Sequence, residues 1–311
     1  MLENQWSRGN FVCVGLDSEF GKIPESEHIR GNNYGVNIAR TIAAFNRAIV
    51  KATGGFVCAY KLNTAFYEAN GDEGIGALQR TIADIHAIAP DVPVILDAKR
   101  ADIGNTNAGY VDAAFGFLRA DAITVHPYLG AEALQPFLAR AEKGIIVLCH
   151  TSNPGAGEFQ DREVVLTFDE LSTVVGDADL ANYLIGEMGW SYPTGGYRIP
   201  MYQYVALRVS RHWNRSDNCA VVVGATYPEK LRAVRRIVGD IPILIPGIGA
   251  QGGDVEKIVS AGKNNCGQGM IINSSRGIIF ASQGADFAKA ARRETERLHD
   301  SIIRCLNHTG N

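Results

Sequence analysis

A carboxylate, an ammonium group and a second carboxylate follow one another closely at Asp97, Lys99 and Asp102. They come directly after Pro93–Leu96, an apolar run typical of a buried strand. Because side chains alternate between the faces of a strand, Asp97 and Lys99 are expected to point the same way, and Asp102 to converge on them. A buried Lys stays charged only beside counter-charges, so this spacing is compatible with a preorganised catalytic charge array. Taken alone, a surface ion pair is the commoner explanation.

Composition limits the classes of protein to consider. The chain has 311 residues, of which 46% are hydrophobic and 20% are charged, as in ordinary globular proteins. The net charge is −3 and there is no basic stripe, so no nucleic-acid partner is expected. The six Cys are scattered without a Cys-x-x-Cys pair, which predicts reduced thiols and a cytoplasmic location. The start has no signal-peptide pattern, and no apolar run approaches the ~20 residues of a membrane helix.

Apolar runs alternate with stretches of helical periodicity along most of the chain. The predicted strands are Phe11–Leu16, Phe56–Tyr60, Val92–Leu96, Asp121–Val125, Gly144–Cys149, Cys219–Val223, Ile241–Ile245 and Gly269–Asn273. The predicted helices are Asn37–Ala52, Gly76–Ala89, Thr106–Arg119, Ala131–Glu142, Asp179–Met188, Gln203–Trp213, Glu229–Val238, Asp254–Ala261 and Ala285–Leu306. Continuous apolar runs suit parallel strands buried on both faces.

Eight such units predict an α/β protein with a (β/α)8 TIM barrel, formed by residues 1–311 as a single domain. The long polar stretch 153–218 is predicted to be an insertion after the fifth strand. A doubly wound open sheet is the alternative. It is disfavoured because Gly15–Ser18, the turn after the first strand, lacks the GxGxxG fingerprint of dinucleotide-binding sheets.

Polar side chains stand at the ends of most predicted strands. They are Asp17, Lys61, Asp97, Lys99, His126, Ser152, Thr226 and Arg276. In a (β/α)8 barrel the chemistry takes place at the carboxyl ends of the strands. Each residue alone is more simply a helix cap or a surface group, but together they favour a functional site on one rim of the barrel.

The loops after the last two strands are predicted to hold a phosphate group. Pro246–Gly253 is rich in glycine and leads into a helix, so backbone N–H groups and the helix N-terminus can approach an anion. Arg276 follows the eighth strand and can bind phosphate oxygens with its forked guanidinium. The alternative is that Gly252–Gly253 only forms a tight turn.

Other side chains carry simpler interpretations. His126 and His150 lack the spacing of metal ligands, so no metal site is predicted, and His126 is expected to form a structural hydrogen bond. Arg232, Arg235 and Arg236 are expected to lie on the solvated face of a helix.

The stretch Asp97–Thr106 resembles the signature of the orotidine 5′-phosphate decarboxylases, Asp-x-Lys-x-x-Asp-Ile-x-x-Thr. Similarity to this family extends over Phe11–Arg276 and includes Ser152–Gly155 of the fifth-strand loop. The long insertion resembles that of a longer bacterial subgroup, type 2. The family resemblance assigns these candidate residues: catalytic Lys61, Asp97, Lys99 and Asp102; substrate-binding Asp17, Lys61, Thr106, Ser152, Gly249, Gln251, Ser275 and Arg276.

The resemblance implies the decarboxylation of orotidine 5′-phosphate to UMP and CO2, the last step of de novo UMP synthesis, without metal or cofactor. Lys99 is implied as the proton donor. The implied protein is a homodimer with shared sites, in which Asp102 and Thr106 act across the interface.

Three rival functions remain at this point. The Mg2+-dependent sugar-phosphate decarboxylases and synthases of the same barrel suprafamily have Glu at the second-strand end, where this chain has Lys61. A Schiff-base aldolase using Lys99 would need a lysine of lowered pKa, whereas neighbouring Asp residues raise it. A non-catalytic nucleotide-binding barrel would be expected to lack a member of the array, and all are present.

Overall fold

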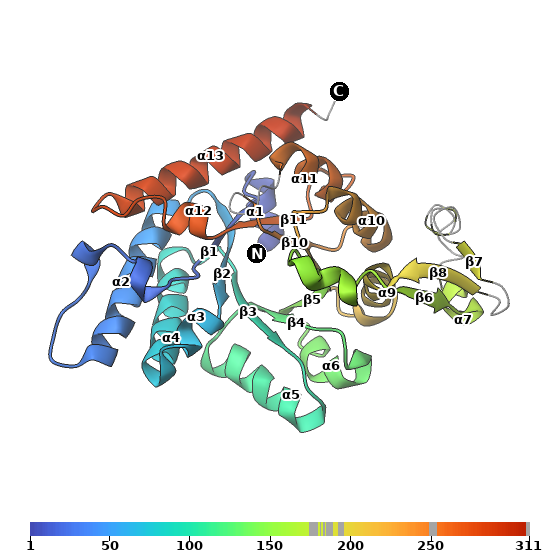
Figure 1. Ribbon diagram of the computed structural model, residues 1–311, viewed down its shortest axis with the longest axis horizontal. Helices are drawn as coiled ribbons and strands as arrows, with labels where there is room; N and C mark the ends of the chain where they lie inside the picture. Colours follow the sequence, from blue (N-terminus) through green and yellow to red (C-terminus); the bar gives the residue numbers. More distant parts are fainter. Residues whose placement is uncertain are drawn as a thin grey trace.

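Eight parallel strands close into a barrel at the centre of the molecule (Figure 1). The computed structural model describes residues 1–173, 180, 182, 184, 189–191, 196–248 and 254–308. The barrel strands are β1 (Val12–Gly15), β2 (Val57–Asn63), β3 (Val94–Arg100), β4 (Ala122–Val125), β5 (Gly144–His150), β9 (Cys219–Val223), β10 (Ile243–Pro246) and β11 (Met270–Ser274). Their order around the barrel is β1-β11-β10-β9-β5-β4-β3-β2, which confirms the predicted (β/α)8 fold and excludes the open sheet.

Helices surround the barrel and connect its strands. They are α1 (Leu2–Ser7), α2 (Tyr34–Thr53), α3 (Ala65–Glu68), α4 (Gly71–Ile88), α5 (Gly104–Val111), α6 (Gly130–Leu138), α9 (Met201–Arg208), α10 (Pro228–Val238), α11 (Val255–Gly262), α12 (Arg276–Ile279) and α13 (Phe287–His308). Helix α2 illustrates how an amphipathic helix packs against the barrel. Its residues Ile42, Phe45 and Ile49 lie on one face of the helix and are buried. No helix among the described residues is long and apolar enough to cross a membrane.

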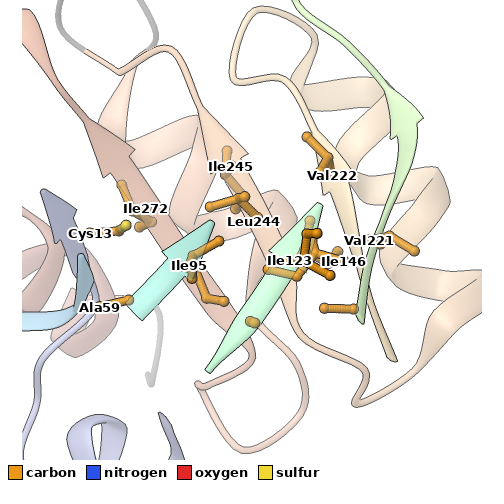
Figure 2. Close-up of a cluster of buried hydrophobic side chains, with 14 of the residues drawn as sticks. Cys13, Ala59, Ile95, Ile123, Ile146, Val221, Val222, Leu244, Ile245 and Ile272 are labelled. Atoms are coloured by element: carbon orange, nitrogen blue, oxygen red, sulfur yellow. The ribbon is translucent and has the colours of Figure 1, made fainter. Parts of the chain in front are cut away.

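A hydrophobic core fills the barrel interior directly below the charged residues at the carboxyl ends of the strands. Figure 2 shows Ala59 and Ile95 among apolar side chains contributed by neighbouring strands. Side chains two residues apart share a face of a strand, so Lys61 follows Ala59 and Asp97 follows Ile95 on the inward face. The strands therefore change from core-forming to charged residues at their carboxyl ends.

Strand β3 differs from the prediction at both ends. It begins at Val94 and runs through the charged residues to Arg100, instead of ending at Leu96. Its pairing with β4 shifts between Leu96 and Arg100, and Lys99 has a positive φ of 48°. The alternation of side chains between the two faces of the strand therefore stops before Lys99, because an irregularity redirects the backbone there.

The predicted helix Thr106–Arg119 also differs from the structure. Helix α5 begins earlier, at Gly104, and keeps α geometry only to Val111. Residues Asp112–Phe117 continue as a π-helix.

The segment between β5 and β9 carries a small antiparallel sheet, which lies beside the barrel beyond α9 in Figure 1. Its elements are β6 (Glu163–Leu166), α7 (Phe168–Ser172), β7 (Gly189–Ser191) and β8 (Gly196–Pro200). Leu166 and Ile199 belong to the same buried cluster as the barrel core. Of the two predicted helices, Gln203–Trp213 corresponds to α9 and a following π-helical turn, and Asp179–Met188 lies largely outside the described residues. The division into one domain with an insertion stays a prediction.

Arg235 corrects the expected solvated face of α10. Its side chain is buried and donates hydrogen bonds to the backbone carbonyls of Gly239, Ile241, Gly262 and Gly269 at 2.6–2.7 Å. Burial lowers the pKa of its guanidinium to about 10. The charge is thus solvated by carbonyl dipoles instead of water, and Arg235 ties α10 to α11 and to the start of β11.

Candidate active site

A cavity of about 180 Å3 opens at the carboxyl ends of the barrel strands. Residues at the ends of β1, β2, β3, β5, β10 and β11, or just after them, line it, among them Asp17, Lys61, Asp97, Ser152, Ser275 and Arg276. The structure thus brings together side chains that the sequence distributes over about 260 positions, as expected when parallel strands end on one rim.

Two lysines hold Asp97 from opposite oxygens. Lys61 Nζ lies 2.8 Å from Asp97 Oδ2, and Lys99 Nζ lies 2.6 Å from Asp97 Oδ1. Lys61 also lies 3.6 Å from Asp17 Oδ1. The Lys61 side chain is 4% exposed, whereas that of Lys99 is 46% exposed. Lys61 is therefore buried, whereas the Lys99 side chain is partly open to solvent.

Asp97 and Lys61 are held in their charged forms by the ion pairs between them and their neighbours. Burial alone would raise the pKa of Asp97, but the charges of Lys61 and Lys99 outweigh burial and hold it well below its usual range. Burial likewise opposes the charge on Lys61, yet Asp97 and Asp17 raise the pKa of its ammonium above the ordinary value. The charges of Asp97 and Lys61 are therefore in place before any ligand arrives.

Thr124 is a member of the site that sequence reasoning missed. Its hydroxyl donates to Asp97 Oδ1 at 2.9 Å and accepts from the backbone N–H of Lys99 at 2.9 Å. The residue is completely buried in β4. These two bonds fix the carboxylate and also support Lys99 in its left-handed backbone conformation, which costs free energy for a residue with a side chain. A lone polar residue within the apolar run of β4 was the available signal.

Asp17 is held from both sides by a buried polar network. The hydroxyl of Tyr67 donates to the carbonyl of Leu16 at 2.9 Å, and the hydroxyl of Ser18 donates to Asn46 Oδ1 at 2.5 Å. Asn46 in turn donates to the Tyr67 oxygen at 2.9 Å. The network fixes the chain on each side of Asp17, whose Oδ1 is buried without a hydrogen bond to any described residue.

The eighth strand closes tightly on the first at one side of the cavity. A Cβ atom added to Gly15 would overlap Ser275 Oγ, so only glycine allows this approach. Asn273, missed by sequence reasoning, lines the cavity with a buried Oδ1 that has no described partner. Arg276 is exposed at the start of α12. The predicted phosphate ligands Gly249 and Gln251 lie outside the described residues.

Asp102 and Thr106 lie apart from the array within one chain. Asp102 Oδ1 accepts the backbone N–H of Ile103 at 2.7 Å, and among the described residues no ion pair joins Asp102 to Lys99. Thr106 is exposed on α5. The convergence of Asp97, Lys99 and Asp102 expected from spacing alone is therefore corrected, because the chain turns away after β3.

Comparison with known proteins finds similarity in sequence and fold to orotidine 5′-phosphate decarboxylases. The model of the orotidine 5′-phosphate decarboxylase / HUMPS family matches residues 11–186. The orotidine 5′-phosphate decarboxylase of Cellvibrio japonicus is 42% identical over 302 residues, covering 97% of this chain and 96% of the relative. That of Ralstonia pickettii is 44% identical over 307 residues, covering 98% of each. The structure of Leishmania donovani OMP decarboxylase is similar, with 32% identity, a TM-score of 0.71 and coverage of 97% and 98% of the two chains.

Proposed function

The chain belongs to the orotidine 5′-phosphate decarboxylase / HUMPS family, and we propose that it uses its charge array to convert orotidine 5′-phosphate to UMP and CO2. The observation that carries the mechanism is the fixed sequence Asp17–Lys61–Asp97–Lys99 at the mouth of the barrel. It places an accessible ammonium group beside a carboxylate that cannot readily take up a proton.

Lys99 is the proton donor in this proposal. The bond between C6 of the pyrimidine and the carboxylate carbon breaks, its electron pair stays on C6, and CO2 leaves. The ammonium of Lys99 stabilises the developing negative charge and then transfers a proton to C6, giving UMP and a neutral amine that recovers a proton from water. Enzymes typically lower activation free energies by up to ~23 kcal/mol, and preorganised charge is usually the largest contribution.

Asp97 acts on the departing carboxylate. Its charge, held by Lys61 and Thr124, would lie near the substrate carboxylate and disfavour the bound ground state by like-charge repulsion. Lys61 compensates the charge of Asp97 within the protein and keeps its carboxylate in place. In this way the array both holds Asp97 in its orientation and supplies the charges that act on the substrate carboxylate.

The rest of the cavity binds the substrate away from the reacting carbon. Ser152 contacts the pyrimidine, and Asp17 with Lys61 contacts the substrate near the array. The remaining ligands are assigned to the phosphate group, namely Gly249, Gln251, Ser275 and Arg276. Binding energy from this remote group is used to hold the ring against the charges.

A homodimer completes the site in our proposal. Asp102 and Thr106 act across the interface, where Asp102 of one chain adds a further carboxylate to the array of the other. Three apolar side chains on the loops after β3 and β4 support this surface as an interface. Ile103 is 61% exposed, Tyr128 is 85% exposed and Leu129 is 44% exposed.

The same geometry disfavours the Mg2+-dependent rival. Lys61 Nζ stands within 3.6 Å of both Asp17 and Asp97, the two carboxylates that would otherwise be metal ligands. A divalent cation between them would meet a fixed positive charge. We also assign the enzyme to the cytoplasm, since its six cysteines are free thiols.

The decisive experiment follows the absorbance of orotidine 5′-phosphate after addition of purified protein in EDTA, with the Lys99→Ala variant as control. Rapid loss with stoichiometric UMP and CO2, absent in the variant, is the expected result. Inactivity in EDTA together with Mg2+-dependent turnover of a sugar phosphate would refute the proposal and reassign Asp17 and Asp97 as metal ligands.

A further inference from the structure

A cluster of polar and charged side chains lies at the end of β5, two residues before Ser152, and has no part in the mechanism above. His150, the last residue of β5, is 1% exposed, and its Nε2 lies 2.9 Å from Lys230 Nζ and 3.1 Å from Asp161 Oδ1. Lys230 Nζ contacts both Asp161 oxygens, at 2.6 and 2.7 Å. His150 Nδ1 is buried without a partner among the described residues. We call Lys230, Asp161 and His150 the brace.

The brace joins three separate parts of the chain. His150 belongs to β5, Asp161 to the segment that precedes β6, and Lys230 to α10. The rings of Tyr202 and Tyr227 pack edge-on against the His150 imidazole, with centroids 5.2 and 5.3 Å away. Lys230 Nζ also lies 4.7 Å from the centre of the Tyr227 ring. The Lys230 side chain is only 19% exposed, so its pairing is better protected from water than that of a surface lysine.

Backbone contacts connect the brace to Ser152, two residues after His150. The carbonyl of His150 accepts from the Gly224 N–H at 2.8 Å, and a Cβ atom on Gly224 would come within 2.8 Å of the Ser152 backbone nitrogen. On the other side, the Thr151 N–H donates to Gln160 Oε1 at 2.8 Å. Gln160 directly precedes Asp161, so movement of Asp161 is transmitted to the loop that carries Ser152.

We propose that Lys230, acting through Asp161 and His150, is a positioning residue that holds Ser152 at the pyrimidine, and that the insertion serves the reaction through this contact. The proposal rests on the proposed function, because it takes Ser152 as a substrate contact. None of the three brace residues lines the cavity, so their effect must pass through the loop.

A double-mutant cycle in the full-length protein tests this coupling. Lys230→Met keeps most of the stem and removes the charge, while Asp161, 40% exposed, can still be hydrated. We expect Lys230→Met to lower kcat/KM for orotidine 5′-phosphate about tenfold in the wild-type background and less than about twofold in the Ser152→Ala background. Asp161→Asn should reproduce the effect if Lys230→Met is poorly folded. Lys289→Met, an exposed lysine of α13, is the matched control and should leave kcat/KM unchanged.

Hydrogen exchange provides a readout that needs no turnover. Amide exchange over residues 151–160 should be faster in Lys230→Met than in wild type, and unchanged in Lys289→Met. Equal losses of kcat/KM in both backgrounds, or unchanged exchange in this loop, would overturn the proposal. If Ser152→Ala alone has no effect, the substrate contact fails and the inference with it. Faster exchange in a protein inactive on orotidine 5′-phosphate would instead place the failure in the proposed function.

Discussion

Replacing Lys61 by Met tests the array most directly, because Met fills the buried stem and lacks the charge. Lys61 lies 2.8 Å from Asp97 and 3.6 Å from Asp17. At an effective dielectric constant of about 20, these separations correspond to about 6 and about 5 kcal/mol of attraction. Withdrawing the ions from water offsets much of this sum. Removing one partner of a buried pair nevertheless costs about 3–5 kcal/mol, because the remaining charge loses its compensation.

The assay is urea unfolding at several pH values. We expect Lys61→Met to lower the free energy of unfolding at pH 7 by about 3–5 kcal/mol. The folded-state pKa of Asp97 is lowered, so its contribution is present above the unfolded value of about 3.9 and is lost as the pH falls through the folded value. The folded-state pKa of Lys61 is raised, so its contribution is present below about 10.4 and is lost as the pH rises through the folded value. The difference between wild type and variant should therefore be largest between these limits and shrink below about pH 4.

Lys22→Met is the matched control. Lys22 lies 2.7 Å from Glu19, nearly the same separation, but its side chain is 48% exposed. This variant should lose less than about 1 kcal/mol. A loss of that small size in Lys61→Met as well would refute the reasoning, since the array would then behave as an ordinary surface pair.

Three further outcomes are expected. Lys99→Ala should abolish turnover, by at least about 1000-fold, with unchanged circular dichroism; near-normal kcat would remove Lys99 from its role. Arg276→Ala should raise KM for orotidine 5′-phosphate at least about tenfold but change that for orotidine little, and equal effects would contradict phosphate binding. Mixing inactive Asp102→Ala and Lys99→Ala subunits should restore partial activity, whereas no recovery after verified subunit exchange would argue for sites contained in one chain.

The barrel and the core of its site could be predicted because they depend on local patterns. Continuous apolar runs identify buried parallel strands, and the side chain that ends each run must lie on the rim. Lys61 and Asp97 therefore could be placed from their own strands alone. Arg235 could not, because its solvation by four carbonyls depends on how α10, α11 and β11 meet in space.

Contacts between neighbouring strands and helices account for the other omissions. Thr124 reaches Asp97 only because β4 pairs with β3 in one particular register, which no property of the β4 sequence specifies. Asn46 and Tyr67 support Asp17 from helices whose packing positions depend on the assembled barrel. The expected convergence of Asp102 on Asp97 and Lys99 was wrong, because the spacing of the motif does not reveal the turn that follows β3.

The seam where β1 meets β11 has a consequence for how the protein is made. Pairing there joins Val12 to Ile272, so the ring can close only after nearly the whole chain has been synthesised. The array lies at the ends of β1, β2 and β3 and needs only an early part of the chain, whereas Ser275 directly follows β11, the last strand. A nascent chain would thus complete the strands that carry the array before β11, which precedes the proposed phosphate ligands Ser275 and Arg276. Under the proposed assignment, tight substrate binding depends on the last strand to be made, and bound nucleotide should stabilise the closed barrel over the open one.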